Sequence, residues 1–513
     1  MPKNIAYIIR AILGIVCISI QGQQVKDLAY VSFWNKAMDS TQFANPALMD
    51  GLHQVNVKTM GGSYYYNEDG KLYNVQKGNK TNKYRLAIHS YTKKESFTFY
   101  SEVYYQNGSK DNVTWNNINY SGRIGPYLIA DSTGGTSYHE EYFFKGGIER
   151  KYDIFSWGIE GSYLARIHYR KNDPRPKTNT SIISIKPGVS FRVKKYRLGL
   201  HVGVDRYEQN LNMRIYGGDN EKDYFYFLEG LGFYDNVFSG TNAYLETDYS
   251  SNAIEAGVQF VPVKKEGLFY TLKWLNSNTE QYFAHTYPSI YKQHFLIGKL
   301  GWTKQYENLF LQFDGLAHFT NGVGTERVYE SIIVNEETDT SDKRLLTESD
   351  NYSLNRLNLH LSAFLSSNIS DQIMVFGRAH IEKQKFKEEY LSSSEMRWQR
   401  TGWKVQPSIQ VLFGHSYLEC SLGYASYLFG NKEIIGIPDG QGNSDIRQST
   451  IKESLILPNW KYKTADYSNY FISIKYTTNI AEKKALNLSA EYSNQNSDLI
   501  QFNSCQLNVG INF

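Results

Sequence analysis

The stretch IFSWGIEGSYLARIHY, residues 154–169, decides the fold class of this chain. Apolar side chains such as Trp157 and Ile159 alternate along it with polar ones such as Glu160 and Arg166. This period of two residues predicts a β-strand with one apolar and one polar face. The alternation far exceeds the roughly five to six residues of a typical strand in a soluble protein. It is long enough to cross a membrane, which takes a tilted strand of about 9–11 residues.

The same alternation recurs from about residue 55 to residue 513, and its interruptions follow a regular order. Short turns lie at 94–95, 151–153, 194–195, 264–266, 307–308, 368–371, 414–416 and 481–484. Long polar segments lie between pairs of strands at 107–139, 210–251, 320–350 and 430–466. With a first strand at 55–66 and a last strand at 502–513, this order predicts about 18 strands, in a range of about 14 to 18. An even number of strands places both termini on the short-turn side, which is the periplasmic side.

Long alternating strands with this order of turns predict an all-β fold: a transmembrane antiparallel up-and-down β-barrel with short periplasmic turns and long extracellular loops. The mean hydropathy of −0.50 excludes repeated helical membrane spans. The 42 Tyr among 513 residues suit the two membrane interfaces, where amphipathic rings gather. A soluble solenoid or propeller, the alternative, would show one constant repeat length. We therefore expect a multi-pass protein of the bacterial outer membrane, in contact with its lipid.

The first 22 residues have the layout of a secretory signal peptide. Lys3 and Arg10 precede an apolar run at 11–20, and polar residues follow directly after the run. The run is too short to span a bilayer as a helix. We therefore predict a signal peptide at 1–22, a periplasmic or hatch segment at 23–54 and the barrel at 55–513.

Several segments resemble known families. The last nine residues, Cys505–Phe513, alternate and end in Phe. They resemble the terminal strand of bacterial outer-membrane barrels, which implies recognition by the barrel-assembly machinery. Asn45, Pro46 and Ala47 resemble a box that precedes the first strand of FadL-like, PorV-like and PorP-like barrels. The resemblance implies that these three residues belong to a hatch, with a plain turn into the barrel as the alternative.

Two further stretches, at 126–131 and 172–176, look like an uncharacterised barrel family of this length from Bacteroidota. The resemblance covers nearly the whole chain. It implies an outer-membrane barrel and names no substrate.

Charged side chains on the predicted lumen face carry both signs in similar numbers. They include Arg85, Glu102, Glu160, Arg166, Arg192, Arg197, Asp205, Arg378 and Lys404. A strongly ion-selective pore would line its constriction with one sign. Mixed signs on neighbouring strands instead predict cross-strand ion pairs, such as Glu160 with Arg192, in a wet or plugged lumen.

One predicted extracellular loop is dense in aromatic residues. The patch comprises Tyr224, Phe225, Tyr226, Phe227, Phe233 and Tyr234. Large exposed apolar patches mark interaction sites, so this loop is a candidate lid or docking patch for a ligand or partner. In the alternative interpretation the segment packs into the barrel mouth against other loops.

The sequence indicates no enzyme, because no catalytic, cofactor-binding or metal-binding set of residues stands out among its 11 scattered His and three Cys. A net charge of +4 gives no reason to expect a nucleic-acid partner. We expect a porin-like channel or receptor for uptake of a small solute. One alternative is a non-conducting subunit of a secretion or uptake complex, partnered by a surface lipoprotein or a larger transport assembly. An outer-membrane enzyme is the remote alternative.

Overall fold

The computed structural model describes most of the chain. The described residues are 25–37, 44–70, 72–216, 224–239, 244–264, 266–335, 340–439, 446–481, 484–497, 499 and 501–513. The predicted signal peptide at 1–22 lies outside these residues.

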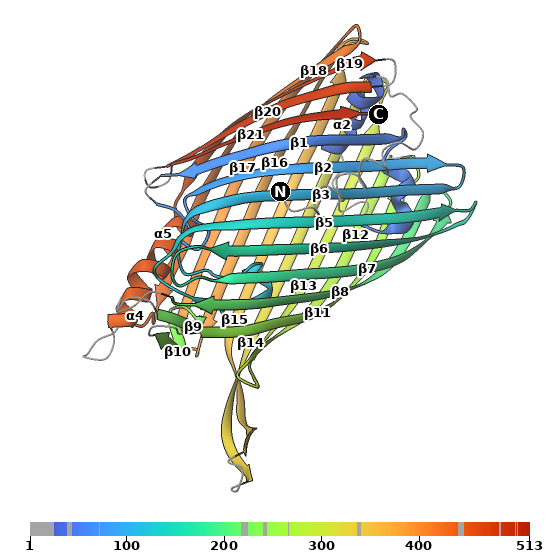
Figure 1. Cartoon of the computed structure of the whole chain (residues 1–513). Coiled ribbons are helices and arrows are strands. Elements are labelled where there is room, and N and C mark those ends of the chain that lie inside the picture. The colour runs from blue at the N-terminus through green and yellow to red at the C-terminus, as the bar shows by residue number, and fades with distance from the viewer. Residues whose placement is uncertain are drawn as a thin grey trace.

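Long antiparallel strands dominate the described residues. They are β1 (Val57–Asp69), β2 (Lys80–Lys94), β3 (Phe97–Val113), β5 (Gly135–Lys151), β6 (Phe155–Arg170), β7 (Lys177–Val193), β8 (Tyr196–Arg214), β11 (Tyr244–Pro262), β12 (Gly267–Phe283), β13 (Thr286–Gln305), β14 (Leu309–Asn335), β15 (Thr340–Asn368), β16 (Ile373–Tyr390), β17 (Ser394–Phe413), β18 (Ser416–Ile435), β19 (Tyr467–Ala481), β20 (Lys484–Asn496) and β21 (Gln501–Asn512). Together these 18 strands form one sheet, and β1 pairs with both β2 and β21. The sheet is therefore a closed barrel (Figure 1), and the predicted fold class is confirmed.

One end of the barrel, which we call the turn end, carries short connections. The turns predicted at 94–95, 194–195 and 414–416 join β2 to β3, β7 to β8 and β17 to β18, as expected. The start of β1 and the end of β21 also lie at the turn end, because Thr59 pairs with Asn512. In barrels of this class the short turns face the periplasm.

The opposite end, which we call the loop end, differs from the prediction in two ways. Segment 320–350 is no loop, since β14 and β15 remain paired from Leu309 to Asn335 and project beyond the barrel as a hairpin (Figure 1). Connections at 284–285 and 391–393 are also short. Polar side chains suggested a loop at 320–350, but a two-stranded ribbon in water also accommodates polar residues on both faces.

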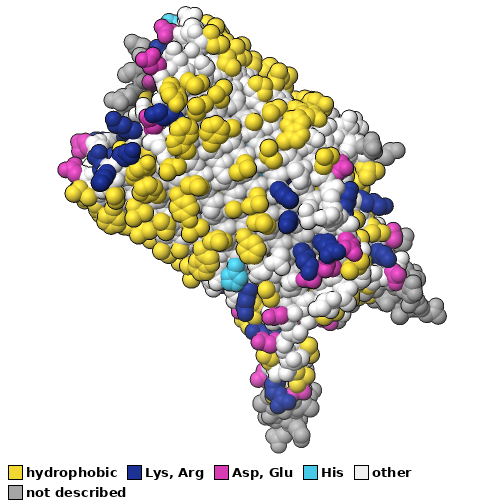
Figure 2. Space-filling view, turned by 180° about the vertical axis from the view of Figure 1, so that it is seen from behind, with side chains coloured by type: hydrophobic (Ala, Val, Ile, Leu, Met, Phe, Trp, Pro, Cys, Tyr) yellow, Lys and Arg dark blue, Asp and Glu magenta, His cyan; other side chains and the backbone are white. Residues whose placement is uncertain are grey.

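The outer wall is apolar between the two ends. Leu200, Leu361 and Ile472 are among many large hydrophobic side chains that remain exposed on the outside of the barrel. Figure 2 shows hydrophobic side chains over the wall, with charged groups gathered toward its two ends. Among the described helices, none is both long and apolar enough to cross a membrane. An apolar band bounded by polar ends is the surface that a lipid bilayer covers.

Shorter elements fill the barrel rather than extend its wall. At the turn end lie α2 (Val25–Ala37) and the 3-10 helix η2 (Pro46–Gly51). At the loop end lie the helices α3 (Ser121–Ile124), α4 (Ile446–Ile451), η3 (Lys452–Ile456) and α5 (Leu457–Thr464). The strands β4 (Ile129–Ala130), β9 (Tyr224–Gly230) and β10 (Phe233–Ser239) form a small separate sheet there. The lumen is therefore occupied from both ends.

Substitution of a lipid-facing residue tests this placement. Leu361 is 67% exposed on the outer wall of β15, whereas the adjacent His360 faces the lumen near Glu382. We expect Leu361→Lys to lower the free energy of unfolding in lipid vesicles by about 2–4 kcal/mol, because a charge near the bilayer midplane is poorly solvated. His360→Lys should cost much less. Urea titration followed by tryptophan fluorescence measures both, and equal losses would contradict the placement.

Candidate functional site

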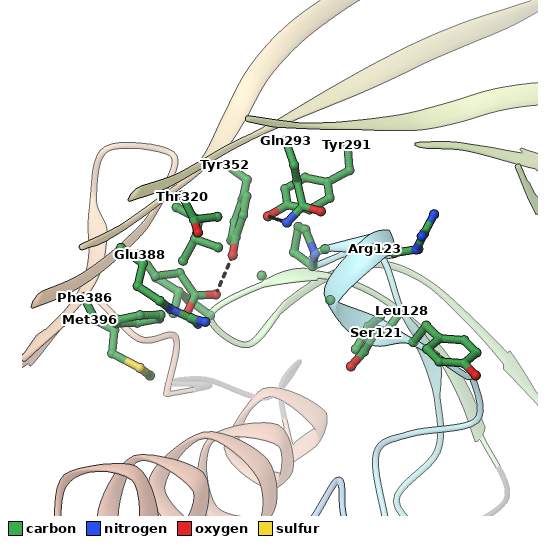
Figure 3. Close-up of a pocket in the computed structure, with 18 of the residues that line it drawn as sticks. Ser121, Arg123, Leu128, Tyr291, Gln293, Thr320, Tyr352, Phe386, Glu388 and Met396 are labelled. Atoms are coloured by element: carbon green, nitrogen blue, oxygen red, sulfur yellow. Dashed lines mark hydrogen bonds between the residues drawn. The ribbon is translucent and has the colours of Figure 1, made fainter. Parts of the chain in front are cut away.

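A cavity lies inside the barrel toward its loop end. Its volume is 730 Å³, within the range of about 300–1,000 Å³ usual for small-molecule sites. Strands β11 to β17 supply one wall, and α3, the β9–β10 turn and α5 supply the other. Figure 3 shows Phe386 and Met396 on the barrel wall across from Arg123 and Leu128 of the inner segments. The cavity therefore lies between the wall and material folded into the lumen.

The inner segments at the loop end form what we call the loop-end insert, residues 114–134, 224–239 and 446–464. Its side chains pack with lumen-facing residues of the wall into the largest hydrophobic core of the described residues. Trp115, Ile129, Phe225 and Ile451 are almost completely buried in it. Burial of an aromatic side chain removes about 150–250 Å² from water. The insert is therefore a packed plug in the barrel mouth rather than a set of loose loops.

The aromatic segment predicted as a docking patch belongs to this insert. Phe225, Tyr226 and Phe227 of β9 are buried, and Phe233 and Tyr234 are partly buried against the same core. Tyr224 begins β9. From Phe225 to Tyr234 the segment packs into the mouth, as the alternative interpretation has it, and does not present an exposed docking surface. A role as a lid stays a prediction. An exposed docking patch and a buried plug are equally rich in aromatic residues, so the sequence alone did not distinguish between them.

A buried ion pair ties the insert to the barrel wall. Arg170 at the end of β6 donates from Nη2 to Asp131 Oδ2 at 2.7 Å and to the carbonyl oxygen of Pro174 at 2.7 Å. Asn117 also donates to Asp131, at 2.7 Å. Both charged side chains are at most 3% exposed. A pair buried this deeply is costly to break by removing one partner, because the other charge remains unsolvated.

The predicted hatch residues lie at the turn end. Asn45 accepts from the amide of Ala47 through Oδ1 at 2.8 Å and so caps η2, where Pro46 is the first residue. The amide of Asn45 donates to Gln259 of β11, and its Nδ2 donates to the carbonyl oxygen of Val189 in β7. The three residues are thus fully buried against the wall. Residues 25–37 and 44–52 are called the turn-end insert below.

Arg197 anchors the turn-end insert by its charge. Its guanidinium pairs with Asp50 of η2 and with Glu149 of β5, the latter at 2.9 Å. It also donates to the carbonyl oxygen of Ala47 at 2.5 Å. Burial would raise the pKa of the Asp50 carboxyl, but the charges of Arg197 and Lys151 outweigh burial and hold that pKa below its ordinary range.

The helix α2 contacts the opposite side of the barrel. Ser32 donates to Glu419 of β18 at 3.0 Å, and Lys36 forms an ion pair with the same carboxylate. Arg378 of β16 donates to the carbonyl oxygens of Lys36 and Ala37, at 3.0 and 2.8 Å. A cation at the C-terminus of a helix satisfies unpaired carbonyl groups and complements the helix dipole. The insert therefore bridges two distant sectors of the wall.

The predicted lumen charges take several roles. Arg197 and Arg378 hold the turn-end insert. Asp205 accepts hydrogen bonds from both terminal guanidinium nitrogens of Arg123, at 2.6 and 2.9 Å. The remaining residues pair or stack with neighbours: Arg85 with Gln106 and the Tyr104 ring, Arg166 with Glu141 and the Tyr120 ring, and Lys404 with the Phe471 ring. Glu102 stands opposite His89 and Lys145 in the strand register.

The predicted pair between Glu160 and Arg192 does not form. Glu160 stands opposite Lys186 in the register of β6 and β7 and lies 3.9 Å from Lys145. Arg192 lies beside the turn after β7, where its side chain is exposed. Alternation identified the shared face of both residues, but only the register shows how far apart they lie along the barrel.

The sequence analysis did not identify the residues that line the cavity as a site. Arg356 and Glu388 occupy the predicted lumen faces of β15 and β16, so alternation would have found their orientation. Lys463 lies on α5, within a segment interpreted as a polar loop, and no sequence signal marked it. Among the residues that the structure describes, no three His, Cys, Asp or Glu side chains are grouped so that they could hold a metal ion.

A family model covers most of this chain. The match spans residues 46–513, and the chain belongs to that family, described as a family of unknown function (DUF6850). The prediction of an uncharacterised barrel family is thereby confirmed, whereas the source in Bacteroidota and the role of the Asn-Pro-Ala box stay predictions. No curated protein matches the chain.

Several solved structures are similar in fold. One is BauA, the ferric preacinetobactin receptor from Acinetobacter baumannii, with 8% identity, a TM-score of 0.38 and coverage of 90% of this chain and 80% of that one. Another is the copper transporter OprC, with 7% identity, a TM-score of 0.41 and coverage of 89% and 81%. A FadL homologue from Pseudomonas aeruginosa has 11% identity, a TM-score of 0.30 and coverage of 92% and 93%.

Removal of the Arg197 guanidinium should loosen the turn-end insert. We expect Arg197→Gln to lower the free energy of its docking by about 3–5 kcal/mol, because Asp50 and Glu149 would remain buried without their partner. Hydrogen exchange of amides 47–52, read by mass spectrometry, measures this. Arg206→Gln on the same strand is the control, since Arg206 forms an exposed pair with Glu208. Unchanged exchange in Arg197→Gln would contradict the anchoring role.

The loop-end insert should respond to pH through Glu229. Burial, reinforced by the charge of Glu326, raises the pKa of Glu229 from 4.5 to about 7. Between these values the unfolded insert loses a proton that the folded insert keeps, so stability should fall as pH rises from about 4.5 to 7, by roughly 2 kcal/mol. Hydrogen exchange in residues 224–230 at pH 5 and 7.5, corrected for intrinsic rates, measures the difference.

Two variants separate the Glu229 effect from general pH sensitivity. Glu229→Gln should abolish most of the difference, because the amide does not titrate while Tyr390 retains a partner for its hydroxyl. Glu208→Gln removes an exposed carboxylate on the outer wall and should leave the difference intact. The same pH response in all three proteins would show that another group is responsible.

Proposed function

We propose that this family member is an outer-membrane channel for uptake of a small solute, with a solute cavity between the barrel wall and the loop-end insert and with two inserts that open in turn. The observation that carries the proposal is the 730 Å³ cavity inside a barrel occupied from both ends. A barrel of about 18 strands is wide enough for an aqueous channel unless something fills it. Here the inserts fill it, so passage requires that they move.

The two inserts differ in the size of the apolar core that holds them, which supports separate movement. The turn-end insert is held by ion pairs and hydrogen bonds at Arg197 and Glu419 and by small apolar clusters. The loop-end insert is held by the largest hydrophobic core of the described residues, together with the Arg170–Asp131 pair. Polar attachments can be exchanged for water at low cost when a site opens, whereas an aromatic core opens as a unit. We assign the Asn45–Pro46–Ala47 box to a hatch at the periplasmic end.

The outer wall of the barrel supports a location in a membrane. An apolar outer wall with polar ends suits a bilayer, and the short turns then face the periplasm. We therefore place the chain in the bacterial outer membrane, inserted by the barrel-assembly machinery and preceded by its signal peptide.

Single-channel recording in planar bilayers tests the proposal. The full chain should conduct little, and Arg197→Gln or deletion of residues 23–54 should raise the conductance, because each releases the turn-end insert. Arg206→Gln should behave like the unmodified chain. Heat-modifiable mobility on electrophoresis shows whether each protein inserted as a folded barrel. Folded, inserted proteins that never conduct, including the deletion variant, would overturn the uptake function.

A specific feature favours a second candidate, a non-conducting subunit of a secretion or uptake complex. The β14–β15 hairpin projects from the loop end (Figure 1) and exposes Val328, Leu345 and Leu346. An exposed apolar ribbon is a surface that a lipoprotein or a transport partner can cover. Purification in mild detergent that recovers only the monomer would count against this candidate.

A further inference from the structure

The cavity carries more positive than negative charge. Four of its lining side chains are cationic, namely Arg123, Lys273, Arg356 and Lys463, and Glu388 is the one acidic side chain among its lining residues. Carboxylates outside the lining neutralise two of these cations. Asp205 binds Arg123 through both of its oxygens. Glu255 binds Lys273 at 3.0 Å.

The other two cations have no carboxylate partner among the described residues. Arg356 on β15 points its guanidinium over the ring of Phe386, with 5.4 Å to the ring centroid. Its Nε is buried and makes no hydrogen bond to any described residue. An unpaired buried donor is costly, so a ligand that accepts its hydrogen bond gains affinity.

Lys463 approaches the same space from α5. Removal from bulk water lowers the pKa of its ammonium, an effect that Glu388 opposes and Arg356 reinforces. Lys463, Glu388 and Arg356 all line the same cavity. The three groups together carry one net positive charge, which favours an anion in the cavity.

Glu388 does not act as an ion-pair partner for Arg356. Tyr352 donates its hydroxyl to Glu388 Oε1 at 3.0 Å, as the dashed line in Figure 3 shows. Its carboxylate is thus engaged with the wall and is not within ion-pair distance of Arg356 among the described contacts. Gln293 donates to the Tyr291 hydroxyl at 3.2 Å, so the neighbouring rings are also fixed in place.

Aromatic side chains line the same cavity as the two cations. Tyr291, Phe295, Tyr352 and Phe386 line the cavity together with Leu354 and Met396. Aromatic and aliphatic walls with a few convergent polar groups are the usual construction of a small-molecule site. A guanidinium matches the planar geometry of a carboxylate, which it binds through two parallel hydrogen bonds.

We infer that the cavity binds a small aromatic or otherwise apolar carboxylate, its anionic end on Arg356 and Lys463 and its body between Tyr291, Tyr352 and Phe386. The inference rests on the proposed function, since it names the class of solute for the same cavity. It assigns Arg356 and Lys463 as the residues that set the charge preference of uptake.

Calorimetric titration of the full chain in detergent with benzoate and its neutral isostere benzamide tests the inference. Benzoate should bind at least about tenfold more tightly, the factor that corresponds to 1.4 kcal/mol. Arg356→Gln and Lys463→Gln should each weaken benzoate binding by about tenfold and leave benzamide unaffected, because each removes a charge-assisted hydrogen bond. Equal affinities for the two compounds in the unmodified chain would overturn the inference.

The matched control is Lys383→Gln. Lys383 is exposed on β16, and the register of that strand places it on the face opposite to Glu382 and Glu388. Its loss should leave benzoate binding unchanged, and an equal loss of binding in this variant would overturn the assignment. Heat-modifiable mobility verifies folding of each variant. Benzoate binding by a barrel that never conducts would refute the channel and retain the anion site, whereas conduction with equal affinity for benzoate and benzamide would do the reverse.

Discussion

Backbone hydrogen bonds between β1 and β21 close the ring of strands, and every other feature of the molecule depends on that closure. A bilayer offers no water to an unpaired strand edge, and each unsatisfied backbone group costs several kcal/mol there. The register from Thr59 opposite Asn512 to Asp69 opposite Phe502 satisfies both edges at once. Closure also creates an interior large enough for side chains, inserts and a solute.

The barrel wall therefore has two different solvents, and its side chains divide between them. Outward positions such as Leu361 meet lipid, whereas lumen positions such as Arg197 and Arg378 meet polar partners. Most lumen charges hold the inserts or each other. Arg356 and Lys463 line one cavity, where Glu388 is the one acidic side chain among the lining residues and is hydrogen-bonded to Tyr352. The cavity therefore carries an excess of positive charge, which favours an anion.

The strands, their alternation and the positions of short turns were predictable, because a period of two residues and turn chemistry are local properties. The faces of Arg197, Asp205 and Arg378 followed from the same period. The hairpin at 320–350 and the helices at 446–464 were not predictable from it, since polar composition is shared by loops, ribbons and exposed helix faces. The aromatic segment at 224–234 was ambiguous because burial and exposure leave the same hydrophobic signature.

The sequence by itself determined that the chain forms a barrel of long alternating strands, about how many strands it has and which residues share a face of each strand. Each of these properties depends on neighbours a few residues apart. Only the tertiary structure decided that Asp50 meets Arg197, that β9 folds into the mouth and that Arg356 and Lys463 line the same cavity. Such meetings join residues far apart in sequence, and strand register and packing set them rather than any local pattern.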